Sequence, residues 1–230
     1  MFKKWLEIFK KDTLMDRSYK RSFMMLDLTR EMFLKARESL RFREDKDVDL
    51  DVRDRDLEIN KYEREVRRNV FNHLVVGGKA DLPSALVLVS IIIDIERIGD
   101  YTKNIVELAI GHPGKLTGGK FEEDLQRIEA AVEDNFIKTR ACFETGDKES
   151  ALKLLEEYKW VNDVCDDSLM GLIREDDKDI RPGDAVALGI YFRWLKRINS
   201  HLRNITTSLV NPFDRIGFEP KDKMEEGRQS

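Results

Sequence analysis

"SIIIDIERIGDYTKNIVELAI", residues 90–110, sets the fold class, because its isoleucines run directly into a cluster of charged residues. At the helical spacing of about 100° per residue, the apolar side chains form one stripe and the polar side chains form another. The polar stripe consists of Glu96, Asp100, Asn104 and Glu107. The upstream run "VLVSIII" (87–93) is β-branched, but its length and flanking residues favour a buried helix over a strand. The stretch therefore predicts an amphipathic helix with an acidic face.

The composition of the whole chain predicts an all-α protein. Of its 230 residues, 37% are charged, 41% are apolar and only five are prolines. The net charge of −4 gives no basic footprint for nucleic acid, so we expect no nucleic-acid partner. The two cysteines, Cys142 and Cys165, fit a reducing compartment better than a disulfide scaffold. No apolar run approaches the about 18 residues that span a bilayer, and residues 1–11 lack a secretory leader. We therefore expect a cytoplasmic protein.

Glycine and proline clusters divide the chain into helices. Between these clusters, apolar residues recur every three or four positions. Asp81 and Asp147 are the expected N-caps of two helices, because a short side-chain acceptor there bonds free backbone N–H groups. The pattern predicts helices at residues 16–43, 48–76, 82–110, 121–144, 148–175 and 184–210, preceded by a short helix at 2–10.

The two halves of the chain repeat one another. "ERIGDYTKNI" (96–105) aligns with "KRINSHLRNI" (196–205) at an offset of 100 residues. "FLKAR" (33–37) aligns with "FIKTR" (136–140) at an offset of 103, and "IN" at position 59 aligns with "VN" at position 161. Three matches in the same order at nearly the same offset indicate an elongated six-helix bundle built from two tandem three-helix repeats.

This repeat divides the chain into four parts. The repeats occupy residues 16–111 and 120–210, and the glycine-rich stretch at 111–119 is the joint between them. An amphipathic segment at residues 1–15 precedes them, and a tail at 211–230 follows.

The helix predicted at 48–76 also carries a polar stripe, in which Asp56, Asn60, Glu63 and Arg67 lie four, three and four residues apart. A short connection favours antiparallel packing of this helix against the next one, so the two stripes would face each other. Glu63, Glu96 and Asp100 would then supply hard oxygen ligands for Mg²⁺, Mn²⁺, Ca²⁺ or iron. The same spacing is typical of a solvated face with ion pairs inside each helix. Both interpretations stay open on the residues alone.

At these residues the chain resembles the PhoU family. "DIERIGDYTKNIVEL" (94–108) is similar to the signature helix of that family, and "KADLPSALVLVSIII" (79–93) keeps its order of an Asp-Leu start and an apolar run. The resemblance covers about residues 16–210 and implies the same tandem three-helix architecture. It also implies a cytoplasmic protein that down-regulates phosphate uptake, in association with the Pst phosphate transporter and the sensor kinase of the phosphate response.

Some members of this family bind metal clusters through an acid and an aspartate four residues apart, one motif in each repeat. The resemblance assigns these roles to Glu96 and Asp100, with Arg97 and Asn104 as motif residues and Glu63 as the acid of the preceding helix.

The second repeat departs from this pattern. Lys196 replaces the glutamate of the motif, Ser200 replaces its aspartate, and Cys165 replaces the acid of the preceding helix. We therefore expect a divalent metal or iron in the first repeat only, with the charge of Lys196 substituting for part of a cation in the second.

Two residues of the motif are identical in both copies, as Arg97 with Arg197 and Asn104 with Asn204. A residue that persists while the neighbouring acids change is more consistent with a structural role. We expect the asparagines to bridge helix backbones and the arginines to pair with an acid on a neighbouring helix.

The two ends of the chain and one internal stretch carry further expectations. Phe2, Trp5, Leu6 and Phe9 share one face of the segment 2–10. That face predicts peripheral association with the inner face of the membrane, or packing on the bundle, or a homodimer contact. The charged stretch at 41–56 is expected to be a solvated turn, and residues 219–230 are expected to be disordered.

The sequence contains no catalytic motif, so we do not expect an enzyme. We expect a regulator of phosphate uptake that docks on a transporter ATPase or permease, on a sensor kinase, or on both. Two alternatives remain, an accessory subunit of a different inorganic-phosphate or cation transporter and a metal-binding helical bundle. The ferritin-like version of the bundle requires Glu-x-x-His pairs, which this chain lacks.

Overall fold

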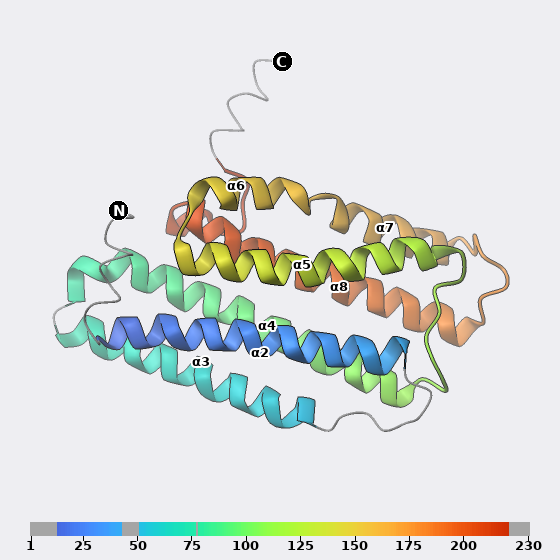
Figure 1. Ribbon diagram of the computed structural model, residues 1–230, viewed down its shortest axis with the longest axis horizontal. Coiled ribbons are helices and arrows are strands. Elements are labelled where there is room, and N and C mark those ends of the chain that lie inside the picture. Colours follow the sequence, from blue (N-terminus) through green and yellow to red (C-terminus); the bar gives the residue numbers. More distant parts are fainter. Residues whose placement is uncertain (1–12, 43–50, 77, 221–230) are drawn as a thin grey trace, which may run out of the picture.

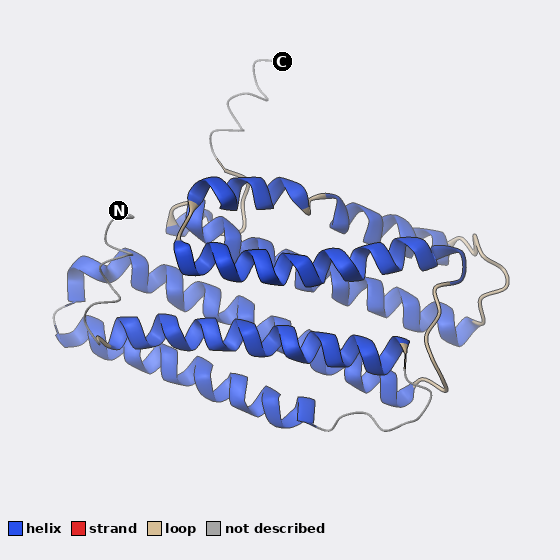
Figure 2. Ribbon diagram, viewed as in Figure 1, coloured by secondary structure: helices blue, strands red, loops and turns tan. Residues whose placement is uncertain are grey.

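The computed structural model of the chain describes residues 13–42, 51–76 and 78–220. These residues form helices joined by loops and contain no strand (Figure 2), which confirms the predicted all-α class. The first repeat contains α2 (Leu14–Arg41), α3 (Asp51–Val76) and α4 (Leu82–Gly111), with the short helix η1 (Gly78–Asp81) between the last two. The second contains η2 (Gly119–Phe121), α5 (Glu122–Thr145), α6 (Lys148–Glu157), α7 (Trp160–Ile173) and α8 (Pro182–Val210), followed by η3 (Phe213–Arg215). The predicted helix at 2–10 lies outside the described residues.

The starts of α2 and α6 can each be traced to a capping side chain. The Thr13 hydroxyl accepts a hydrogen bond from the Asp16 backbone N–H, and the Asp16 carboxylate accepts one from the Thr13 N–H, forming a capping box. Asp147 caps α6 as predicted, because its carboxylate accepts from the Glu149 N–H at 3.1 Å. Asp81 is the N-cap residue of α4 as predicted, but its side chain does not make the expected capping bond. Its carboxylate lies 2.9 Å from Nε2 of His73 on α3 instead.

The single helix predicted at 148–175 is divided in two at Tyr158 and Lys159, between α6 and α7. Side chains of α8 bind the backbone carbonyls at this break. The Asn199 amide donates to the Tyr158 carbonyl at 3.3 Å, and the Arg203 guanidinium donates to the Leu155 carbonyl. Insertion of a side chain into the helical hydrogen-bond ladder is a known cause of helix breaks. Sequence periodicity missed this break because the apolar pattern runs straight through it.

The two repeats pack side by side along their lengths (Figure 1). Within each repeat, the first and last helices pack together, α2 against α4 and α5 against α8. The joint between the repeats consists of α2 against α5 and α4 against α8, while α3 and the α6–α7 pair lie on opposite outer sides. The middle helix of each repeat is therefore the one that faces outward.

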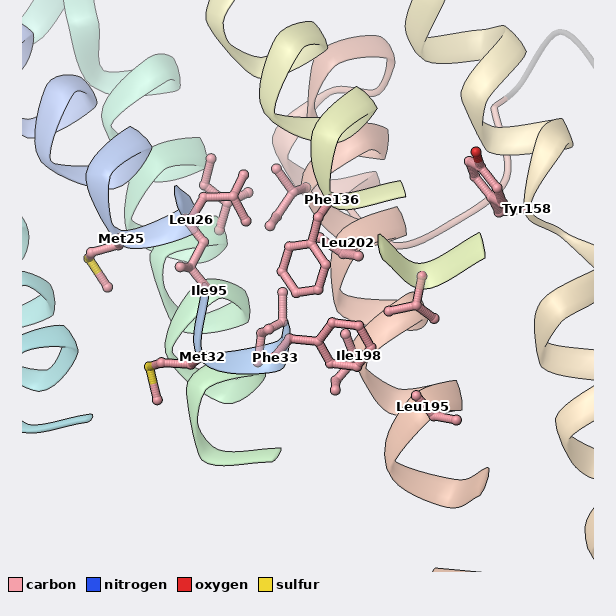
Figure 3. Packing of buried hydrophobic residues seen from close by; sticks show 14 of the residues in the cluster. Met25, Leu26, Met32, Phe33, Ile95, Phe136, Tyr158, Leu195, Ile198 and Leu202 are labelled. Carbon is pink, nitrogen blue, oxygen red and sulfur yellow. The ribbon is translucent and has the colours of Figure 1, made fainter. Parts of the chain in front are cut away.

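Equivalent residues of the two repeats touch each other across this joint. Phe33 and Phe136 occupy the same position in the two copies, and their ring centroids lie 5.6 Å apart in the core (Figure 3). Tyr101 and His201 are also equivalent, and their rings stack at 5.8 Å with an angle of 29° between their planes. Contact of a residue with its own counterpart is the mark of two-fold packing. The chain therefore folds as two like units related by a local two-fold arrangement.

Charged residues contribute to the joint as well. Arg41, predicted to lie in a solvated turn, is buried, and its guanidinium donates to Glu129 at 3.1 Å and to Glu122 and the Leu116 carbonyl. Burial raises the pKa of Glu129, which also accepts a hydrogen bond from the Tyr191 hydroxyl at 2.7 Å. The solvated-turn prediction is therefore wrong at Arg41, because α5 brings acidic partners to it, and residues 43–50 lie outside the described part.

The apolar core runs through both repeats. The buried residues labelled in Figure 3 come from α2, α4, α5 and α8 together with Tyr158 at the break. None of the helices in the described residues is both long enough and apolar enough to cross a membrane.

Candidate functional site

The acidic residues predicted on α3 and α4 do come together. The Lys103 ammonium of α4 lies 3.3 Å from a carboxylate oxygen of Asp56 on α3 and 3.3 Å from one of Asp100 on its own helix. This bridge holds the two polar stripes against each other, as their spacing predicted. Asp56 belongs to the stretch expected to be solvated, yet it is only 9% exposed because α4 covers it.

Glu96 shows that the acids share one electrostatic environment. Burial raises the pKa of Glu96, and the negative charges of Asp100, Glu63 and Asp56 raise it further, against the opposing effect of Arg97. Its side chain is 15% exposed, so these charges act on it with little screening by water. The predicted site residues Glu63, Glu96 and Asp100 are therefore neighbours.

The cluster nevertheless does not have the geometry of a metal centre. Each acid has a basic neighbour, since Glu63 pairs with Arg67 at 2.8 Å and Asp100 with Arg97 at 2.9 Å. In the part of the chain that the structure describes, no three histidine, cysteine, aspartate or glutamate side chains are grouped so that they could hold a metal ion. Lys103 takes the central position between Asp56 and Asp100, where a cation would otherwise bridge them. As they stand, these residues do not fit a metal.

The corresponding face of the second repeat carries the opposite charge. Lys196, in the position of Glu96, forms an ion pair with Asp166 of α7. Ser200, in the position of Asp100, donates to the Lys196 carbonyl at 2.8 Å and accepts from the Asn162 amide at 3.2 Å. Cys165, in the position of Glu63, is buried, and burial raises the pKa of its thiol to about 12. An internal positive charge thus occupies this face, as the sequence predicted for Lys196.

The four residues retained in both copies differ in their contacts. Arg97 pairs with acids of its own helix, whereas the Arg197 Nε donates to the Tyr101 hydroxyl of α4 at 3.2 Å. Asn204 donates to the Asp94 carboxylate of α4 at 2.9 Å, and Asn104 is partly exposed on α4. Within residues 13–42, 51–76 and 78–220, the expected pairing with an acid of a neighbouring helix is therefore absent for both arginines. In the second copy, the side chains meet the other repeat instead.

Asp94 is a residue whose role sequence reasoning missed. It lies off the acidic stripe, and one oxygen of its carboxylate is 2.7 Å from Nδ1 of His201 and 2.9 Å from the Asn204 amide, both on α8. His201 is 9% exposed. The position of Asp94 between the two stripes of its helix was the available signal, since that side of α4 faces the joint.

Three comparisons place this architecture among known proteins. Residues 24–109, which include the acidic cluster, match the model of the PhoU domain family. A crystal structure of PhoU from Pseudomonas aeruginosa is 22% identical in sequence, with a TM-score of 0.75 over 91% of this chain and 97% of that one. The crystal structure of the phosphate transport system regulatory protein PhoU from Streptococcus pneumoniae is 17% identical, with a TM-score of 0.75 over 85% of this chain and 93% of that one.

No curated protein matches the chain. The structural similarity extends over both repeats, whereas the sequence match is confined to the first, in which the acidic motif is intact. The chain therefore carries a PhoU domain at residues 24–109, and over nearly its whole length it has the fold of the PhoU proteins.

Proposed function

We propose that this protein regulates phosphate uptake without catalysis, by docking on the ATPase or permease of a phosphate transporter, on the sensor kinase of the phosphate response, or on both. The observation that carries the proposal is the PhoU domain at residues 24–109 within a PhoU fold that spans both repeats. The solved Streptococcus pneumoniae protein of this fold is named as a phosphate transport system regulatory protein.

An apolar groove of about 550 Å³ on the second repeat offers a docking surface. It lies between α7 and α8, and its walls include Ile173 and Val186, which are 64% and 63% exposed. Arg193 stands beside these apolar side chains. Large exposed apolar patches with polar residues at their margin are typical of protein interaction sites. The groove therefore supports docking by the second repeat, on the side of the molecule away from α3.

Docking is tested by binding of the purified protein to the transporter ATPase and to the cytoplasmic part of the sensor kinase from the same organism. We expect Ile173→Asp combined with Val186→Asp to weaken binding at least tenfold, because the new charges would have to be buried on docking. Ile137→Asp is the matched control, since Ile137 is 48% exposed on α5 outside the groove. Absence of binding to every transporter and kinase component, with normal phosphate uptake in cells lacking the protein, would contradict the proposal.

Four finer expectations stay predictions. They are the metal in the first repeat, the homodimer, the cytoplasmic location and the contact of residues 2–10 with a membrane, which lies outside the described residues. The negative charge of Glu63, Glu96 and Asp100 motivates the first of these, but Lys103 occupies the place of a bridging cation, so the residues as they stand do not fit it. The alternative of an accessory subunit for a different transporter predicts the same groove with a different binding partner.

A further inference from the structure

A small polar pocket of about 160 Å³ lies where the second repeat has lost its acids. One wall comes from α6, α7 and α8, and the other comes from residues 211–220, which we call the C-terminal strap. Lys159 in the break between α6 and α7 also reaches the strap, through Glu219. The pocket is lined by Leu155, Asn162, Ser200, Arg203, Asn204, Thr207, Gly217, Phe218 and Glu219.

The strap is held over the pocket by specific hydrogen bonds. The Gly217 N–H donates to the Thr207 hydroxyl of α8 at 2.8 Å, and the Asn211 amide donates to the Phe218 carbonyl at 2.7 Å. Gly217 has a φ of 86°, and a Cβ at this position would lie 3.1 Å from the Asn204 side-chain oxygen. A glycine is therefore needed for this close approach. Residues 219–230 were expected to be disordered, but Glu219 makes contacts in this strap, and residues 221–230 lie outside the described part.

The Glu219 carboxylate of the strap lies near two positively charged side chains. Nη2 of Arg203 lies 3.4 Å from Glu219, and the Lys159 ammonium lies 3.8 Å from the same carboxylate. Among the described residues that line the pocket, Glu219 is the only acidic one. Both ion-pair distances are long, and the Glu219 side chain is 39% exposed, so the carboxylate is held weakly.

Comparison with the first repeat explains why a cation remains here. Arg203 occupies the position of Lys103, which has Asp56 and Asp100 as partners. In the second repeat these acids are replaced by Tyr158 and Ser200, yet the basic residue is kept. Its carboxylate partner comes instead from outside the repeat, from the strap.

We propose that this pocket is an oxyanion site and that Glu219 fills it as an internal substitute for the ligand. The ligand is a carboxylate or phosphate group, which Arg203 and Lys159 bind by charge and the hydroxyl and amide groups of Ser200 and Asn162 bind by hydrogen bonds. A free ion and an acidic or phosphorylated side chain of a partner share this chemistry, and the pocket is too small for a nucleotide. Binding displaces the Glu219 carboxylate from Arg203 and Lys159. The site does not depend on the proposed function.

The test is titration of the full-length protein with inorganic phosphate at fixed ionic strength, followed by calorimetry and by ³¹P NMR. Glu219→Gln removes the competing charge and keeps the side-chain shape, so we expect phosphate to bind about tenfold more tightly than to the wild type. The matched control is Glu149→Gln, which changes the net charge equally on the exposed face of α6, where Glu149 pairs with Lys153. In the Glu219→Gln background, Lys159→Ala should reverse the gain.

A parallel titration with a short phosphoserine peptide identifies the source of the ligand. If Glu219→Gln raises the affinity for phosphate, the natural ligand is a free ion. If it raises the affinity for the peptide alone, the natural ligand is a side chain of a partner. Either result supports the proposed site. Circular dichroism verifies that each variant is folded. If Glu219→Gln binds both probes no more tightly than Glu149→Gln does, the proposal is wrong.

Discussion

The two repeats share one scaffold but differ at the same place, where the middle helix meets the last. In the first repeat, α3 runs unbroken past α4, and the shared face is acidic. In the second, the middle helix is divided into α6 and α7, and the face carries Lys196 and Arg203. The joint between the repeats is kept, because Phe33 and Tyr101 still meet their counterparts. A duplicated helical unit can therefore change its surface chemistry freely while the packing across its joint is maintained.

A single position accounts for much of this difference. Gly99 of α4 lets α3 approach closely, since a Cβ there would lie 3.0 Å from the Ile59 side chain. The equivalent Asn199 of α8 carries a buried amide instead. Its oxygen accepts from Asn135 at 2.8 Å, and its nitrogen donates to Asn162 at 3.0 Å and to the Tyr158 carbonyl at the break. Because a buried amide must have partners, the neighbouring helix gives up part of its own hydrogen-bond ladder.

The largest expected effect tests whether the two halves of the joint are equivalent. Phe33→Ala and Phe136→Ala should each lower the free energy of unfolding by about 3–5 kcal/mol, because both remove a fully buried ring. The two rings are in contact, so the double variant should lose less than the sum of the single losses. Urea denaturation of the four proteins measures this. Strongly unequal losses of stability in the two single variants would show that the two repeats do not contribute equally to the joint.

The second prediction concerns the buried amide. Asn199→Gly copies the first repeat at this position but removes the buried hydrogen bonds that Asn199 makes with Asn135, Asn162 and the Tyr158 carbonyl, so we expect a loss of about 2–4 kcal/mol. Asn72→Gly on the exposed face of α3 is the control and should show only the difference in helix propensity between asparagine and glycine, about 0.5 kcal/mol or less. Hydrogen exchange should become faster at residues 155–161, which span the break. Equal losses for the two variants would mean that Asn199 does not hold the break.

The smallest expected effect concerns Glu96 and Lys196, which occupy equivalent positions in the two repeats and carry opposite charges. The pKa of Glu96 is raised in the folded state, so the folded protein binds more protons, and its stability falls as the pH rises above about 4.3, the unfolded value. Glu96→Gln should remove this fall and stabilise the protein at pH 7 by at most about 1 kcal/mol. Lys196→Gln should destabilise the protein slightly, because the substitution removes the ion pair with Asp166.

Denaturation curves between about pH 4 and about pH 8, an interval that includes the unfolded glutamate pKa of about 4.3, measure the stability of both variants. Glu107→Gln on the exposed part of α4 is the control. A lower stability of Glu96→Gln than of the wild type at pH 7 would show that the acid has a favourable role, for example as a ligand. Elemental analysis of the same samples tests the metal predicted in the first repeat. Because Lys103 occupies the place of a bridging cation, we expect no metal there, and metal that is bound to the wild type and falls in Glu96→Gln would overturn this expectation.

Most of the architecture was predictable because it follows from local sequence patterns. The recurrence of apolar residues every three or four positions placed six helical stretches, and the match of "FLKAR" to "FIKTR" placed Phe33 and Phe136 in equivalent positions. The acidic stripes on α3 and α4 met as expected, because helical spacing determines which residues share a face.

The sequence by itself determined the helical class, the duplication and the acidic face, because each depends on residues within one or two helices. Only the tertiary structure decided which charged residues are buried and where the helix predicted at 148–175 breaks. The sequence predicted a solvated Arg41, but in the structure Glu129 of α5 lies against it. Asp94 had no predicted role, but in the structure it contacts His201 and Asn204 of α8. The physical reason is that the cost of burying a charge or of breaking a helix depends on partners from distant segments, and periodicity along the chain contains no record of them.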